Sequence, residues 1–133
     1  ILFLIGVVVS FATGSSWGVW ALGMPIALPM ANAMGIPLTL AIGAVVSGGL
    51  FGDHCSPISD TTIQSSTSAC CDHLQHVKTQ LPYALTVGIS SLIGFLFAGL
   101  VAPVLALPVT LVCIIAALLV MKNISRKRAA VAA

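Results

Sequence analysis

The sequence predicts an all-α integral membrane protein: a polytopic bundle of helices in which at least one helix is discontinuous, either broken or re-entrant. Hydrophobic residues make up 59% of the 133 residues and charged residues only 6%, whereas a soluble domain is about one-quarter charged. Apolar segments recur along the whole chain, which argues against a signal peptide ahead of a soluble core. We therefore expect a multi-pass protein of the cell membrane whose main partner is the lipid bilayer.

A polar island, residues 52–68, lies between the uncharged runs 1–51 and 79–121 and predicts the discontinuity. The island contains two of the three carboxylates of the chain and many hydroxyl side chains. Polar groups at membrane depth are costly unless protein or a water-filled cavity satisfies them. We therefore interpret the island as the working site of a membrane protein.

Residues 1–11 are apolar and are predicted to form the end of a spanning helix, which the polar break 12–18 interrupts. Two glycines and three hydroxyl side chains in this break weaken a helix and free backbone carbonyls. A break of this kind persists in lipid where it faces a polar cavity. An interfacial turn, with Trp17 and Trp20 in the aromatic belt, is an equally good interpretation of the sequence.

Residues 19–34 are predicted to form a helix kinked by Pro25 and Pro29, each of which removes a backbone hydrogen bond. A turn is expected at 32–37. The next apolar segment, 38–51, has fourteen residues, whereas a full span needs ~20. Small residues recur along it at helical spacing, a pattern that lets helices approach closely: Gly43 and Ser47, Ala44 and Gly48, Gly48 and Gly52. The segment is typical of half of a discontinuous helix.

The second half of that helix is predicted to begin at Pro57, with Ser56 as its N-cap. Asp60 would then share one face with Gln64 and Thr67. Asp53 lies just before the break, so both carboxylates are predicted to point at the unwound region. Whether the unit 38–71 crosses the membrane as a broken helix or returns as a re-entrant hairpin stays open.

The rest of the chain predicts a polar loop at 72–78, a plain span at 81–101 with Pro82 near its start, a turn at 103–108 and a last span at 109–121. Basic residues cluster after the last span: Lys122, Arg126, Lys127 and Arg128.

The positive-inside rule places this cluster in the cytoplasm. We therefore expect a transmembrane domain over residues 1–121 and a cytoplasmic basic tail over residues 122–133. Four basic residues beside a membrane span are too few for a nucleic-acid surface, so no nucleic acid is expected as a partner.

The oxygen atoms of the island suit a hard cation such as sodium. Burial weakens the preference of a carboxylate for its ionised form, so one group can hold either a proton or a sodium ion. That competition is the minimal mechanism of an antiporter. Asp60 is the predicted exchanging carboxylate and sodium ligand, with Asp53 supporting it. The other predicted ion ligands are Ser56, Ser59, Thr61 and Gln64, and supporting roles are expected for Thr13, Ser15, Ser16 and His54.

Two other chemistries fit the sequence less well. A zinc or copper site would need ligand spacings that the candidate residues lack: His54, Cys55, Cys70, Cys71, His73 and His76. An intramembrane aspartyl protease needs two facing carboxylates, whereas Asp53 and Asp60 belong to one local motif. We expect neither an enzyme nor a cofactor, with Na⁺ and H⁺ as transported ions.

Three ordered segments resemble the NhaC-type sodium/proton antiporter family. Residues 52–62 (Gly-Asp-His-Cys-Ser-Pro-Ile-Ser-Asp-Thr-Thr) resemble its signature, and residues 11–18 resemble its upstream Thr-Gly-Thr-Ser-Trp-Gly element, with Ser15 in place of a threonine. Asp72-His73 and residues 76–84 resemble the segment that follows the signature. The pair Cys70-Cys71, directly before Asp72, departs from the pattern of the family and is not explained by the resemblance.

The resemblance implies a secondary transporter of the ion-transporter superfamily, built from inverted repeats with broken helices. It implies exchange of cytoplasmic sodium for external protons, and it makes this chain the C-terminal part of a longer transporter. The remaining N-terminal part would then be a partner of this one, and a homodimer stays open. Some members of the family exchange organic acids such as malate and lactate, so a sodium- and proton-coupled organic-acid antiporter is the alternative.

The last two apolar segments are predicted to form a hairpin whose two ends lie in the cytoplasm. Single cysteines at positions 76 and 126, in a background without other reactive cysteines, should resist a membrane-impermeant thiol reagent in intact cells. They should react after the membrane is permeabilised. Labelling of either position from outside would overturn this topology.

Overall fold

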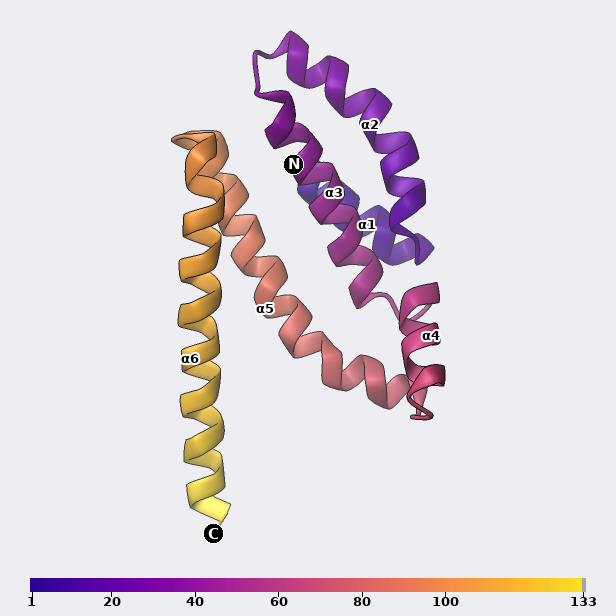
Figure 1. The fold of residues 1–133 in the computed structure, drawn as a ribbon, viewed down its shortest axis with the longest axis vertical. Coiled ribbons are helices and arrows are strands. Elements are labelled where there is room, and N and C mark those ends of the chain that lie inside the picture. The colour runs from indigo at the N-terminus through magenta and orange to yellow at the C-terminus, as the bar shows by residue number, and fades with distance from the viewer. Residues whose placement is uncertain (133) are drawn as a thin grey trace. The chain divides into compact units, whose positions relative to one another are not determined.

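The computed structural model describes the backbone of residues 1–132 and the side chains of residues 1–123. The chain divides into two compact units, Ile1–Gly88 and Ile89–Ala133, each of which is described by itself. Figure 1 shows the order of the helices: α1 (Leu2–Thr13), α2 (Ser16–Ala33), α3 (Leu38–Cys55), α4 (Asp60–Ser68), α5 (His73–Leu100), the short 3₁₀-helix η1 (Pro103–Leu105) and α6 (Ala106–Ala132).

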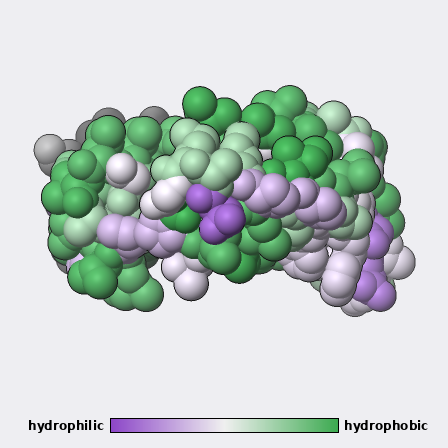
Figure 2. Space-filling model, turned by 90° about the horizontal axis from the view of Figure 1, so that it is seen from above, coloured by the Kyte–Doolittle hydropathy of each residue, from purple (hydrophilic) through white to green (hydrophobic). Residues whose placement is uncertain are grey.

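The predicted all-α membrane architecture is confirmed for the described residues. Three helical segments are long and apolar enough to cross a membrane: α3, α5 and residues Pro103–Asn123. Apolar surface predominates on the face drawn in Figure 2, and hydrophilic residues are confined to limited patches there. Large apolar side chains are therefore exposed along most of the helices, as expected of a protein surrounded by lipid.

Helices α1 and α3 pack closely because glycines remove the side chains between them. A β-carbon added to Gly48 would meet the carbonyl oxygen of Phe3, and one added to Gly52 would meet that of Val7. On the α1 side of the contact, a β-carbon added to Gly6 would lie 3.2 Å from the backbone of Gly48. The predicted small-residue face of 38–52 is thus confirmed at Gly48 and Gly52, and its partner is α1.

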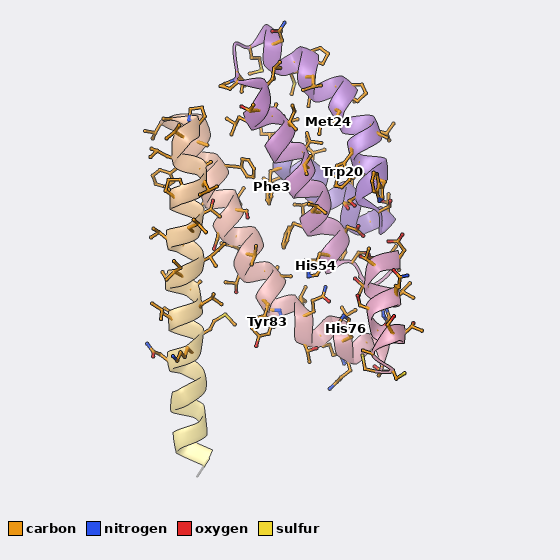
Figure 3. All side chains as sticks on the ribbon, viewed as in Figure 1. Phe3, Trp20, Met24, His54, His76 and Tyr83 are labelled. Atoms are coloured by element: carbon orange, nitrogen blue, oxygen red, sulfur yellow. The ribbon has the colours of Figure 1, made fainter. Side chains whose placement is uncertain are left out.

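Helix α2 lies along α3 and closes the core of the first unit (Figure 1). Its residues Val19 and Ala27 are buried with Val45 of α3. Trp20 and Met24 pack against this cluster, on the side of α2 that faces α3 in Figure 3. The two internal prolines lie where expected, the ribbon of α2 curves in Figure 1, and the turn that follows contains Gly35 in the left-handed conformation.

The predicted boundaries of the discontinuous helix are wrong at both sides of the break. Helix α3 continues through Cys55 and has 18 residues, so it is long enough to span a membrane and is not a half-length segment. Helix α4 begins at Asp60 rather than at Pro57. The backbone of Ser56 is extended, as the residue before a proline prefers, and its hydroxyl bonds to α1 instead of capping a helix.

The polar loop predicted at 72–78 is also wrong, because residues 73–78 form the first turns of α5 and Asp72 directly precedes them. The carboxylate of Asp72 accepts a hydrogen bond from the backbone N–H of Gln75 at 2.8 Å, which is the geometry of a helix N-cap. The sequence Asp72-His73-Leu74-Gln75 has the spacing of a capping box, so this signal is present in the sequence. Pro82 therefore lies inside α5 rather than near its start.

The second unit contains the predicted hairpin, formed by the end of α5, η1 and α6. A β-carbon at Gly94 of α5 would meet the Thr110 side chain of α6 and would lie 3.0 Å from the Ala106 carbonyl oxygen. Helix α6 continues without interruption past residue 121, where the sequence predicted the basic tail to begin. The side chains of Arg126, Lys127 and Arg128 lie outside the described residues.

The contact between α1 and α3 gives a stability test with a matched control. Gly52→Ala places a methyl group against the Val7 carbonyl and should destabilise the protein by about 1–3 kcal/mol, the usual cost of overpacking. Gly18→Ala, where no atom lies within 4 Å, should raise stability by up to about 1 kcal/mol through helix propensity. Thermal unfolding of both detergent-solubilised variants measures the difference. Equal midpoints would mean that α1 and α3 do not pack as described.

Candidate functional site

The break between α1 and α2 lies directly against the break between α3 and α4. Gly14 ends α1 in the left-handed conformation, with φ of 67°. A β-carbon at this position would lie 2.7 Å from the carbonyl oxygen of Ile58, in the middle of the second break. Only glycine fits, because the position combines a positive φ with a close approach to another backbone. The two breaks therefore share one site.

Two serine hydroxyls fasten α1 to the backbone of α3 and the second break. Ser10 Oγ donates to the carbonyl oxygen of Gly49 at 2.6 Å, and Ser56 Oγ donates to that of Phe11 at 2.8 Å. Both serines are fully buried. These bonds satisfy polar groups that would otherwise be costly in an apolar setting, and they fix α1 relative to the end of α3.

The carboxylate of Asp53 occupies the centre of this site. It is 6% exposed in the last turn of α3. One carboxylate oxygen accepts hydrogen bonds from the backbone N–H of Ser16 at 3.3 Å and from its hydroxyl at 2.9 Å. The other accepts from Ser59 Oγ at 2.6 Å. Asp53 thus joins the N-terminus of α2 to the residue before α4, and the N-terminus of a helix favours a negative charge.

Further hydroxyls extend the polar site into the first turn of α4. Ser59 Oγ lies 2.8 Å from Thr61 Oγ1, and either oxygen can be the donor. Thr62 is 3% exposed, and its hydroxyl has no hydrogen-bond partner among the described residues. An unsatisfied buried oxygen costs free energy unless a ligand, ion or water completes it. Sequence reasoning did not single out Thr62.

The remaining predicted site residues lie outside this cluster. Asp60 is exposed, and its carboxylate accepts a hydrogen bond from the backbone N–H of Thr61 at 2.7 Å. Gln64 is also exposed, on the same helix. Thr13 Oγ1 bonds to the carbonyl of Val9 within α1, and Ser15 is the residue before α2. His54 is exposed, and Figure 3 shows it at the end of α3 that leads into the break.

The first turns of α5 hold the second break through its backbone carbonyls, which the sequence did not predict. His73 Nε2 lies 2.6 Å from the carbonyl oxygen of Pro57, and Gln80 Nε2 donates to that of His54. These two side chains are seven residues apart and share one face of the helix. Farther along the same face, Gly88 lets α5 pack against the ring of Phe51. The seven-residue spacing of His73 and Gln80 was a sequence signal for this shared face. It was overlooked because residues 72–78 were predicted to form a loop.

The arrangement suits a small hard cation. One buried carboxylate and several neutral hydroxyl oxygens meet beside two interrupted helices, and oxygen atoms are the ligands that sodium prefers. Within the described residues, no three His, Cys, Asp or Glu residues gather as a metal site would require. The zinc or copper alternative therefore has no candidate centre in the described part of the chain.

Comparison of the sequence with known proteins identifies a family that the chain matches. The model of the Na⁺/H⁺ antiporter family matches residues 1–100. An uncharacterised protein of Haemophilus influenzae is 51% identical over 100 residues, which cover 74% of this chain and 19% of that protein. The Na⁺/H⁺ antiporter NhaC of Alkalihalophilus pseudofirmus is 36% identical over 97 residues, which cover 72% of this chain and 21% of that protein.

A third relative carries a different substrate in its name. The malate-2H⁺/Na⁺-lactate antiporter of Bacillus subtilis is 36% identical over 97 residues, which cover 69% of this chain and 21% of that protein. The chain thus spans about one-fifth of the length of these curated relatives. No solved structure matches the chain.

Proposed function

Because this chain belongs to the Na⁺/H⁺ antiporter family, we propose that it forms part of a secondary transporter that exchanges Na⁺ for H⁺ across the cell membrane. The observation that carries the proposal is the buried carboxylate of Asp53, held by hydroxyl groups where two helix breaks meet. An acidic residue buried inside a membrane protein is by default a candidate for an ion or proton pathway.

We assign the exchange of sodium for a proton to Asp53. This assignment reverses the roles that the sequence alone suggests for the two aspartates. Asp53 is buried among hydroxyls, whereas Asp60 is exposed and bonds only its own helix end among the contacts described. A buried carboxylate has lost its hydration, and binding a proton or a sodium ion compensates for that loss. An exposed carboxylate keeps its hydration and gains less from either ion.

The hydroxyls around Asp53 suit both states because they can rotate. With an ionised carboxylate, Ser59 donates to Asp53 as observed. When the carboxyl group is protonated, it can donate to Ser59 Oγ, which can turn its own proton to Thr61 Oγ1 at 2.8 Å. When sodium is bound, the same hydroxyls turn their lone pairs to the ion. Exchange then needs rotation of hydroxyls and no large rearrangement of charge.

Further oxygen ligands complete the ion shell in this proposal. Sodium prefers more oxygens than one carboxylate and the hydroxyls of Ser16, Ser59 and Thr61 supply. The buried, unpaired hydroxyl of Thr62 is a candidate in the same turn of α4. The part of the transporter beyond this chain would supply the rest, because transporters of this kind build their site from both repeats.

The orientation of the transporter follows from its basic residues. We propose that the C-terminus is cytoplasmic, because Lys122 and the three basic residues at 126–128 follow the last apolar segment. The multi-pass character itself rests on the family and on the apolar helices.

A sodium- and proton-coupled exchanger of organic acids is the second candidate, favoured by the similarity to the malate-2H⁺/Na⁺-lactate antiporter. The site around Asp53 argues for a cation instead. Its described groups are an acid and neutral hydroxyls, and an organic anion would need a cationic or N–H-rich partner from elsewhere in the protein.

Proteoliposomes that contain the full-length transporter test the proposed function. An inward sodium gradient should drive proton efflux, read with an internal pH-sensitive dye, when no organic acid is present. Addition of malate or lactate should leave the rate unchanged. Proton movement that requires an organic acid would favour the second candidate, and none under either condition would refute both.

The two aspartates give the sharper test. Asp53→Asn keeps the shape of the side chain, and its amide oxygen can still accept from Ser16 while its NH₂ group donates to Ser59 Oγ. The amide cannot exchange ions, so sodium-driven proton movement should fall to background. Asp60→Asn is the matched control and should retain most of the activity. Both variants are compared at equal reconstituted amounts over a range of pH. Activity in Asp53→Asn together with loss in Asp60→Asn would restore the roles suggested by the sequence.

A further inference from the structure

The buried face of α4 is polar, which reverses the usual pattern of a helix in a folded protein. Only two residues of α4 itself are buried, Thr62 and Ser66, and Ser59 directly before the helix is buried as well. The apolar residue Ile63, by contrast, is 46% exposed. A helix normally buries its apolar side chains and exposes its polar ones. Apolar packing therefore does not account for the hydroxyls on this face.

The three buried hydroxyls follow one line along the helix. Thr62 comes three residues after Ser59 and four residues before Ser66, and side chains at these spacings are neighbours on one helix face. The line begins at the proposed ion site, because Ser59 Oγ donates to the carboxylate of Asp53 at 2.6 Å. It leads away from the break along α4, towards the turn at 69–72, whose residues are all exposed.

Thr62 is the one member of this line whose hydroxyl has no hydrogen-bond partner among the described residues. Ser59 is paired with Asp53, and Ser66 Oγ lies 3.1 Å from Nδ1 of the half-buried His73. Thr62 is only 3% exposed, so bulk water does not replace the missing partner. A buried hydroxyl in this state is costly unless a bound water or ion completes it. The position between the two paired serines thus calls for a ligand of that kind.

We propose that the buried face of α4 lines the route by which Na⁺ reaches Asp53, and that the hydroxyl of Thr62 binds the ion on the way. The inference rests on the proposed function, since it names a path to the same ion site. Neutral hydroxyl oxygens suit a route because they replace part of the hydration of sodium. They also carry no charge that would trap the ion, and passage requires binding that is weak enough for release. The route opens at the exposed turn 69–72.

Thiol accessibility tests the route without depending on transport. Thr62→Cys is made in the full-length transporter after its native cysteines are replaced by serine, and the detergent-solubilised protein is treated with a small cationic methanethiosulfonate. The reagent should modify this cysteine, and Na⁺ should slow the reaction whereas choline at the same concentration should not. Ala27→Cys is the control for burial, because Ala27 is 0% exposed within the apolar cluster of α2 and α3 and should stay unmodified.

A second pair of variants tests the hydroxyl itself. Thr62→Val keeps nearly the same shape and removes the oxygen. The sodium concentration that gives half-maximal exchange should rise roughly tenfold, the usual effect of losing one contact to a charged group. Thr67→Val is the matched control on the same helix, because Thr67 is exposed and its Oγ1 donates to the carbonyl oxygen of Ile63 at 2.8 Å. This variant should leave the half-maximal concentration unchanged.

Each result decides the proposal. If Thr62→Cys reacts no faster than Ala27→Cys, the rest of the transporter covers Thr62 and the route is wrong, even where sodium still drives proton movement. A reaction that Na⁺ does not slow would also overturn the route, and so would equal effects of Thr62→Val and Thr67→Val. If Na⁺ protects Thr62→Cys but a sodium gradient drives no proton movement, the route stands and the proposed exchange fails.

Discussion

The carbonyl oxygens of Phe3 and Val7 face Gly48 and Gly52 so closely that no β-carbon fits between α1 and α3. Lipid provides little hydrophobic drive for helices to associate, so close packing and buried hydrogen bonds must hold them together. The glycines allow both, since they bring the backbones near enough for Ser10 to reach Gly49. This contact also brings Gly14, after α1, against Ile58, after α3.

Once α1 is fixed on α3, the ends of the two helices meet. Gly14 then lies on Ile58, and Ser16 begins α2 within hydrogen-bonding distance of Asp53. Side chains satisfy backbone carbonyls near the breaks, as Ser56 does for Phe11 and His73 does for Pro57. An interruption that would be unstable alone in lipid therefore becomes stable as one of a pair. Asp53 likewise satisfies the start of α2, because its carboxylate accepts hydrogen bonds from the N–H and the hydroxyl of Ser16.

Composition and local pattern sufficed to predict the membrane class, the two breaks and the glycine face, because each depends on residues close in the sequence. Boundaries were harder. The helix start at Asp60 was misplaced because Ser56 and Pro57 have the pattern of an N-cap and first turn, but a tertiary bond to Phe11 takes the Ser56 hydroxyl. The loop predicted at 72–78 overlooked the Asp72 cap.

The sequence indicated Ser16 and Ser59 as site residues but did not indicate that both would bond to Asp53. Ser16 is 37 residues from Asp53, and only the crossing of α1 and α3 brings them together. Asp60 has the richer local set of oxygens, so a local analysis favours it. The fold instead turns Asp60 outward and surrounds Asp53 with oxygens from the distant Ser16 and from Ser59 in the adjacent break.

A site made of one carboxylate and neutral oxygens also has a simple electrostatic property. A proton and a sodium ion each neutralise it with one positive charge, so the site has the same net charge in both loaded states. The surrounding apolar helices then disfavour only the empty, ionised state, because an isolated charge is costly there. An antiporter needs this penalty, since a site that crosses empty would leak its gradient. The paired breaks thus give one buried acid, whose burial would couple the two ions in the exchange that we propose.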